Sequence, residues 1–222
     1  MARLSFAILP FAVVAGSLLS GVADARNRPQ HDATASRAIE QGAPTLAPFQ
    51  HVRFCLHNPA ECKSDPAQRA RIELNAETSQ MLDRVNRSVN AAIKPTAKSY
   101  GSNLADKWTI APAAGDCNDY AVTKRHELIA GGLPANALRL SVVKTASGVG
   151  HLVLVVATTR GDMVLDNLTQ SILPWQRTDY QWLKIQSATD ARFWYEVRST
   201  GSYVARAERG VRLAFHRRQR DI

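Results

Sequence analysis

Cys117 is the residue of this chain whose type and setting best suit chemistry. The 222-residue chain has only three cysteines, and this one stands in "AGDCNDYAV", residues 114–122, directly before a helix-like run. Three roles are open to it: a nucleophile, a metal ligand, or a small apolar residue of the core. The positive end of a helix stabilises a thiolate, the form that attacks carbonyl groups, so this position favours the nucleophile.

The residues around Cys117 predict the helix that positions it. Gly115 lets the chain turn, Asp116 is a suitable N-cap, and helical residues continue behind the cysteine. Gly131-Gly132 ends this run, so we expect the helix to extend to about Ala130.

A nucleophilic thiol needs a histidine to take its proton, and His151 is the best placed of the six histidines. It begins the apolar strand "HLVLVVAT", where a side chain borders both solvent and core. His126 lies nine residues beyond Cys117 on the same helix, on roughly the opposite face and too far along the axis. The others fall in the N-terminal segment, beside the other two cysteines, or in the basic tail: His31, His51, His57 and His216.

Asp166 is the candidate acid that would orient His151. It stands near the end of the next strand, "MVLDN", and their contact depends on the turn between the two strands. A turn at residues 158–159 places the two residues directly opposite each other, and one centred between 159 and 160 makes them diagonal neighbours roughly 7 to 8 Å apart. A turn on residues 160–161 separates them by about 13 Å and breaks the pair.

The other two cysteines predict a disulfide. Cys55 and Cys62 lie seven residues apart in "FCLHNPAEC", and such a close pair is expected to be oxidised in an oxidising compartment. This pairing leaves Cys117 as the odd cysteine of an exported protein, which makes it a candidate reactive thiol.

Residues 1–25 have the pattern of a cleavable export signal. Arg3 precedes an uncharged apolar stretch, and Ala23-Asp24-Ala25 is a small-x-small cleavage site. The alternative is a transmembrane anchor, but Pro10 and several Gly and Ser residues interrupt the stretch. We therefore expect a periplasmic or otherwise exported protein without stable membrane insertion after cleavage.

The rest of the chain reads as a flexible leader over residues 26–50, one domain over 51–200 and a basic tail over 201–222. The net charge is +9, but the excess collects in the tail without interleaved aromatic residues, so we expect no nucleic-acid partner. A helical period runs from about Ala67 to Pro95, and four strands are expected near 138–143, 151–158, 163–167 and 192–197. This order predicts an α+β fold with N-terminal helices packed against one antiparallel sheet.

Two longer stretches carry a resemblance. "GDCNDYAVTKRHELIAGG" and "GHLVLVVATTRGDMVLDNLTQSILPW" resemble the bacterial transglutaminase-like cysteine peptidases, the family that includes the LapG-type periplasmic proteases. The resemblance implies a papain-like, transglutaminase-like core with a cysteine-bearing helix on an antiparallel sheet. It also implies Cys117 as nucleophile, His151 as base and Asp166 as the acid that orients the base.

The same resemblance bears on cofactor and substrate. It implies a calcium site at Asp116 and position 118, but Asn118 replaces the usual Glu, and each lost charge weakens a site for a hard cation. No cofactor is required for the thiol chemistry itself. The implied substrate is a protein, by analogy a surface adhesin. Two alternatives stay open: a transglutaminase or glutamine deamidase with the same residues, and a catalytically silent binding module.

Overall fold

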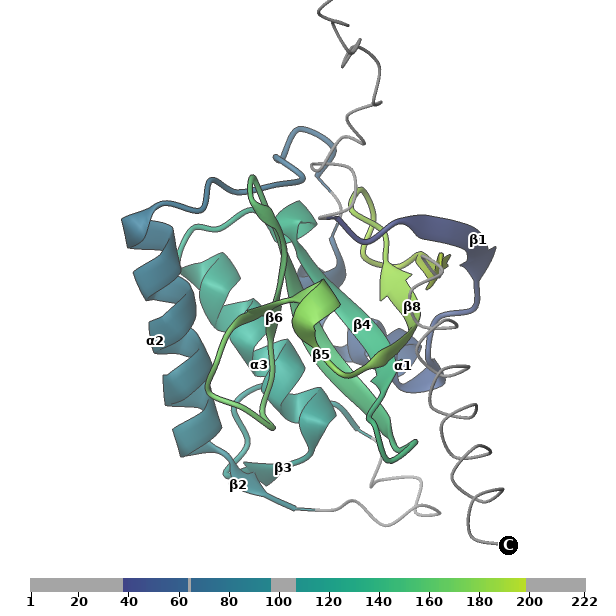
Figure 1. Ribbon diagram of the computed structural model, residues 1–222. Helices are drawn as coiled ribbons and strands as arrows, with labels where there is room; N and C mark the ends of the chain where they lie inside the picture. Colours follow the sequence, from purple (N-terminus) through teal and green to yellow (C-terminus); the bar gives the residue numbers. More distant parts are fainter. Residues whose placement is uncertain (1–37, 64, 97–106, 199–222) are drawn as a thin grey trace, which may run out of the picture. The chain divides into compact units, whose positions relative to one another are not determined.

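The computed structural model describes residues 38–63, 65–96 and 107–198. The expected export signal and basic tail lie outside these residues. Within them the chain forms the α+β fold that was predicted, with three α-helices and a seven-stranded sheet (Figure 1). None of the described helices is long and apolar enough to cross a membrane.

The elements follow one another in a simple order. The helices are α1 (Phe49–His57), α2 (Ala76–Ala92) and α3 (Cys117–Ala130), with 3-10 turns η2 (Pro59–Cys62), η3 (Ala135–Ala137) and η4 (Trp175–Arg177). The strands are β1 (Gln41–Thr45), β2 (Lys94–Pro95), β3 (Ala114–Gly115), β4 (Leu138–Lys144), β5 (Gly150–Thr158), β6 (Gly161–Leu165), β7 (Leu173–Pro174), β8 (Gln181–Gln186) and β9 (Trp194–Val197).

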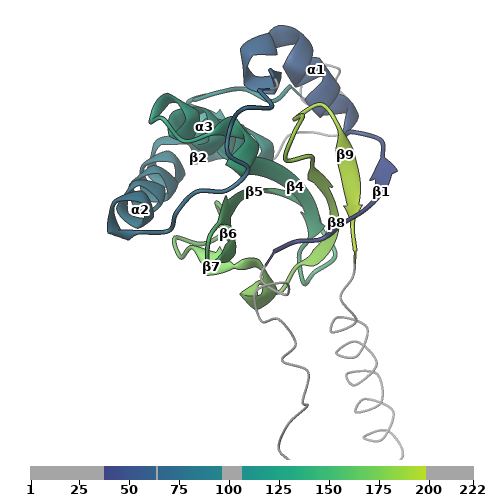
Figure 2. The same cartoon turned by 90° about the horizontal axis from the view of Figure 1, so that it is seen from above.

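The large sheet is antiparallel and has the order β1-β9-β8-β4-β5-β6-β7. Figure 2 shows that this sheet is strongly curled and that α1, α2 and α3 lie outside the curl. Strands β2 and β3 form a separate parallel pair directly before α3.

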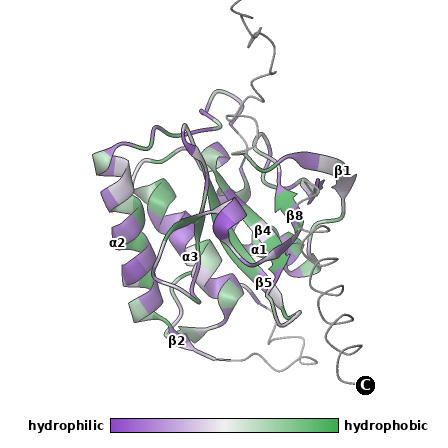
Figure 3. Cartoon of the chain, viewed as in Figure 1, coloured by the Kyte–Doolittle hydropathy of each residue, from purple (hydrophilic) through white to green (hydrophobic). Residues whose placement is uncertain are grey.

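Two cores lie on the two faces of the sheet. On the helical side, Leu152, Leu154 and Val156 of β5 pack with residues of α1 and α3 such as Phe54 and Leu128. On the other side, a second buried cluster contains Ile39, Val143, Val153, Val155, Val164, Trp175 and Ile185. Because β5 is buried on both faces, it is continuously hydrophobic in sequence, and it is largely green in Figure 3.

The structure corrects the predicted boundaries in two places. Residues 26–50 were expected to form a flexible leader, yet Gln41–Thr45 is strand β1, paired with β9, and α1 begins at Phe49. The first long helix begins at Ala76 and not near Ala67, because Asn75 caps it and forms a capping box with Thr78. Edge strand β1 contains Pro44, which is tolerated at the edge of a sheet but hides the strand pattern in the sequence.

Candidate active site

Helix α3 begins at Cys117, as the sequence predicted. The Asp116 side chain accepts a hydrogen bond from the Asn118 backbone N–H at 3.0 Å, and the Asp119 side chain accepts one from the Asp116 N–H at 3.0 Å. This reciprocal arrangement is a capping box, which satisfies N–H groups at the helix start. It fixes the first turn, so Cys117 occupies the first helical position in a defined orientation and is partly exposed.

We expected Gly115 to allow a turn of the chain, but the structure requires glycine here because a side chain would not fit. Its backbone does not adopt the left-handed conformation found at Gly132, Gly148 and Gly161. A Cβ at this position would instead lie 2.4 Å from Oδ2 of Asp119. The glycine therefore makes room for the side chain that completes the capping box.

The β5–β6 hairpin brings His151 and Asp166 together. Thr158 pairs with Gly161, so the turn consists of Thr159 and Arg160, and the register makes His151 and Asp166 diagonal neighbours. This is the turn centred between residues 159 and 160, and the His and Asp side chains can span the diagonal distance that it gives. The contact is formed: Nε2 of His151 lies 2.8 Å from Oδ1 of Asp166.

The side chains of His151 and Asp166 are both buried, with residue exposures of 7% and 3%. Burial alone lowers the pKa of His151, but hydrogen bonds with Asp166 and Cys117 and their negative charges outweigh it and raise the pKa to about 9. Because Nε2 is engaged by Asp166, Nδ1 is the ring nitrogen left for the thiol. The arrangement favours the protonated imidazolium form of His151.

Asp166 is held as a carboxylate from several directions. Burial raises its pKa, but the hydrogen bond and charge of His151, with further hydrogen bonds from Tyr180 and the Leu168 N–H, lower it overall. The Leu168 N–H lies 3.0 Å from Oδ1. On helix α2, Nδ2 of Asn90 donates to the backbone oxygen of Asp166 at 2.9 Å, which fixes the chain directly after β6.

Tyr180 is a site residue that the sequence did not reveal. Its hydroxyl donates to Oδ2 of Asp166, and its ring centroid lies 5.7 Å from that of His151. Burial and the Asp166 carboxylate raise the pKa of Tyr180, so the hydroxyl stays protonated and acts as a donor. Tyr180 lies in an irregular stretch before β8, where hydrophobic periodicity gives no signal.

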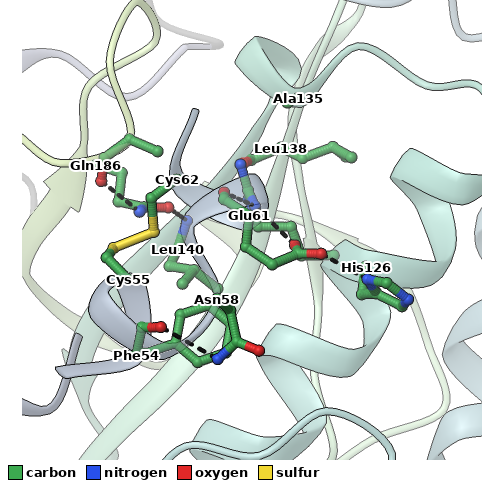
Figure 4. Close-up of polar contacts among 12 residues, drawn as sticks. Phe54, Cys55, Asn58, Glu61, Cys62, His126, Ala135, Leu138, Leu140 and Gln186 are labelled. Carbon is green, nitrogen blue, oxygen red and sulfur yellow. Dashed lines mark hydrogen bonds and ion pairs between the residues drawn. A yellow bond between two sulfur atoms is a disulfide. The ribbon is translucent and has the colours of Figure 1, made fainter. Parts of the chain in front are cut away.

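The predicted Cys55–Cys62 disulfide is present, with an S–S distance of 2.05 Å, and Cys117 is a free cysteine. The disulfide closes the segment from α1 to η2, and Glu61 in this segment contacts the middle of α3 (Figure 4). Oε1 of Glu61 lies 2.5 Å from Nδ1 of His126, and Oε2 lies 3.3 Å from the buried Arg125. His126 thus attaches α3 to the disulfide segment and, as expected, is not beside Cys117.

His51, one of the histidines set aside, is a buried core residue. Nε2 of Gln186 and Nε1 of Trp194 lie 2.9 Å and 3.3 Å from its two ring nitrogens. Burial and, to a smaller extent, the charge of Arg125 lower the pKa of His51 to about 4, so it is neutral. Trp108 also belongs to this core, where it is 3% exposed.

The acids beside Cys117 are largely occupied by the backbone. Oδ1 of Asp119 accepts from the Thr109 N–H at 2.8 Å, Oδ2 accepts from Asp116, and Oδ1 of Asp116 accepts from Asn118. Calcium takes six to eight oxygen ligands, preferably anionic ones. Two carboxylate oxygens cap α3, a third binds the Thr109 N–H, and residue 118 is uncharged, so these residues suit helix capping better than a calcium cage.

The sequence comparisons define the class of protein. Residues 41–202 match the family described as the bacterial transglutaminase-like cysteine proteinases. The chain belongs to this family and is therefore a cysteine peptidase of the transglutaminase-like type, which acts on protein substrates. No curated protein matches the chain.

Solved structures of LapG from Legionella pneumophila are similar to this chain. The calcium-bound form is 21% identical over 68% of this chain and 82% of its own, with a TM-score of 0.45. The EGTA-treated form is 22% identical over 69% of this chain and 78% of its own, with a TM-score of 0.46. A third LapG structure is 21% identical over 69% and 80%, also with a TM-score of 0.46.

Proposed function

We propose that the protein is an exported cysteine peptidase that cleaves peptide bonds of an envelope or surface protein through Cys117, His151 and Asp166. The observation that carries this proposal is the buried His151–Asp166 pair, with 2.8 Å between Nε2 and Oδ1, whose imidazole also interacts with Cys117 at the start of α3. Nucleophile, base and orienting acid in hydrogen-bond contact are the arrangement that thiol acyl transfer requires.

The reaction proceeds in two steps through a thioester. The Cys117 thiolate attacks the peptide carbonyl carbon, the C–N bond breaks, and His151 gives its proton to the departing amine. His151 then takes a proton from water as the water attacks the thioester, and the C–S bond breaks to release the carboxylate product and the thiolate. Asp166 keeps the imidazole oriented and stabilises its positive charge during both steps.

The start of α3 supports the charged intermediates. The backbone N–H of Cys117 is at the first helical position, where N–H groups have no intrahelical acceptor. It is the natural first donor to the oxyanion that forms when the thiolate attacks. The positive end of the helix dipole favours the thiolate and the oxyanion alike.

Two features of the chain support the proposed location and, with it, the substrate class. The export-like pattern over residues 1–25 and the disulfide both suit an oxidising compartment, which is the basis for proposing a periplasmic location. An envelope protein such as a surface adhesin is then the substrate within reach. Fold and site chemistry do not determine which protein is cut.

We expect little or no dependence on calcium. The LapG structures include calcium-bound and EGTA-treated forms, whereas here Asn118 carries no charge and the neighbouring carboxylates bind backbone N–H groups. Activity should change less than about twofold when a chelator is added, since no hard-cation site is lost. A loss of more than tenfold that added calcium restores would assign calcium to these residues.

A cleavage assay tests the proposed function. Envelope extracts are incubated with the wild-type protein and with Cys117→Ala, and new N-termini are identified by mass spectrometry. New N-termini that need Cys117 support hydrolysis, whereas ammonia release or added mass on glutamine would support the transglutaminase or deamidase alternative. Products that form equally with Cys117→Ala would overturn the proposal, and a Cys117 that iodoacetamide modifies no faster than a free model cysteine would favour the silent binding module.

A further inference from the structure

Lys124 is the unexplained charged residue of the catalytic helix. It lies seven residues, or about two turns, after Cys117 and so on the same side of α3. Its side chain is buried, with 1% of the residue exposed, and within the described part of the chain its Nζ has no hydrogen-bond partner. Buried amines without a partner are costly, so such a residue calls for a reason.

The packing of α2 against α3 shows which residues face Lys124. The Tyr120 hydroxyl donates to the Ile93 oxygen at 2.5 Å, so the start of α3 lies beside the end of α2. A Cβ at Gly131 would lie 3.4 Å from Sδ of Met81, so the end of α3 lies beside the start of α2. The helices are therefore antiparallel, and Lys124, one turn beyond Tyr120, lies alongside the C-terminal half of α2.

The C-terminal half of α2 contributes two asparagines that hold the segment after β6. Nδ2 of Asn90 donates to the backbone oxygens of Asp166 at 2.9 Å and Thr169 at 3.3 Å. Nδ2 of Asn86 donates to the backbone oxygen of Gln170 at 3.1 Å. The same segment carries the Asp166 carboxylate, so α2 and α3 both lie next to the Asp166 end of the catalytic site.

This region contains buried hydrogen-bond acceptors without a donor and one buried donor group without an acceptor. The Oδ1 atoms of Asn86, Asn90 and Asn167 are buried and have no hydrogen-bond partner among the described residues. The Lys124 ammonium is a buried group with three donors and none of them used. Asp166 supplies the opposite charge: burial lowers the pKa of Lys124 to about 7, and the nearby carboxylate opposes that decrease.

We propose that Lys124 is a positioning residue for Asp166, because its ammonium stabilises segment 166–170 and the Asp166 carboxylate in the orientation that His151 needs. This role rests on the proposed function of Cys117, His151 and Asp166. Lys124 does not touch the reacting atoms but acts through Asp166. On this proposal, the buried polar side chains hold segment 166–170 in place for catalysis. They are Lys124, Asn86, Asn90 and Asn167.

A double-mutant cycle tests the proposal without knowledge of the substrate. The second-order rate constant for alkylation of Cys117 by iodoacetamide is measured at about pH 6, where the Lys124 ammonium is protonated. The proteins compared are wild type, Lys124→Met, Asp166→Asn and the double variant. Lys184→Met is the matched control, because Lys184 is a lysine of β8 that donates to the Leu46 backbone oxygen, away from His151 and Asp166 in the sequence.

If Lys124 acts through Asp166, Lys124→Met should slow alkylation about tenfold, and the double variant should be no slower than Asp166→Asn alone. Lys184→Met should react like wild type. A Lys124→Met protein that reacts within twofold of wild type, or effects that multiply in the double variant, would overturn the proposal. Should Lys124→Met fail to fold by circular dichroism, Lys124→Gln, which keeps two donors, takes its place in the same cycle.

The proposed function fails by a different result. If wild-type Cys117 reacts no faster than a free model cysteine, the reactive thiol itself is absent and the catalytic proposal is wrong. If wild type reacts fast and Lys124→Met matches it, the catalytic proposal stands and only the role of Lys124 is refuted.

Discussion

Tyr180 binds the carboxylate oxygen of Asp166 that His151 leaves unused. The imidazole takes Oδ1, and the phenol donates to Oδ2. The Leu168 N–H also donates to Oδ1, so the carboxylate is fixed about its own axis by partners on both oxygens. Because the Tyr180 ring also contacts the His151 ring at a centroid distance of 5.7 Å, one residue orients both members of the pair.

Replacing Tyr180 with Phe removes this hydrogen bond and keeps the ring contact. A hydrogen bond to a charged group contributes about 1.5 to 3 kcal/mol, so we expect Cys117 alkylation and peptide cleavage to slow about tenfold. The measurement is the pair of rate constants for wild type and Tyr180→Phe. Tyr195→Phe, a tyrosine of β9, is the matched control, and equal rates for all three proteins would show that Tyr180 does not orient the site.

The raised pKa of His151 predicts how stability depends on pH. The folded-state pKa is about 9, above the ordinary value of 6.5, so the folded chain binds the proton more tightly than the unfolded chain does. The stabilisation is complete below about pH 6.5 and is lost as the pH rises towards 9. Chemical unfolding of wild type and His151→Gln between pH 6 and 10 should show a free-energy difference that declines over this window.

Asp166→Asn is the control variant for this measurement of stability against pH. Its loss of charge removes the main partner that raises the pKa of His151, so its stability should decline less steeply between pH 6.5 and 9 than that of wild type. If wild type and Asp166→Asn have parallel curves, the Asp166 carboxylate does not hold the His151 proton.

Features that depend on neighbouring residues were predictable from the sequence. Helix α3 has the predicted bounds, because its capping residues and its terminal glycines are local signals. The sequence allowed three positions for the β5–β6 turn. Each gives a different distance between His151 and Asp166, because moving the turn by one residue shifts the pairing of the strands by two. The sequence could not make that choice, because residues 158–161 allow several turns.

Features that depend on tertiary contacts were not predictable. Tyr180 reaches Asp166 from a stretch without regular period, and no local pattern of the sequence shows that Lys124 is buried. Both positions are determined by elements that pack against α3 and β6 from elsewhere in the chain. Strand β1 was missed for the same reason, since its pairing with β9 overrides its proline-containing sequence.

The close approach of Gly115 to Asp119 predicts the effect of a single methyl group. In Gly115→Ala the new Cβ would lie 2.4 Å from Oδ2 and 2.8 Å from Cβ of Asp119, so the Asp119 side chain must move. The capping box then opens, which should lower the free energy of unfolding by about 2 kcal/mol and reduce the reactivity of Cys117. Gly150→Ala is the control for stability, because nothing lies within 4 Å of its added Cβ, and equal destabilisation of the two variants would contradict this account.

The disulfide predicts a combined effect on stability and on α3. Cys55 and Cys62 close a short loop, whose crosslink contributes about 2.5 kcal/mol through the unfolded state. The bond also holds Glu61 against Arg125 and His126 on α3, so its loss loosens the helix that carries Cys117. The double variant Cys55→Ala/Cys62→Ala should therefore unfold at a lower temperature and react more slowly with iodoacetamide at Cys117.

Two controls separate the crosslink from its contacts. Dithiothreitol should destabilise wild type to the level of the double variant and leave the double variant itself unchanged, and intact mass before and after reduction should report one bridge. Glu61→Gln keeps the disulfide but removes the charge that pairs with the buried Arg125, so it should destabilise the protein without changing its response to dithiothreitol. If the double variant and wild type alkylate at the same rate while differing in stability, the disulfide segment stabilises the fold without positioning Cys117.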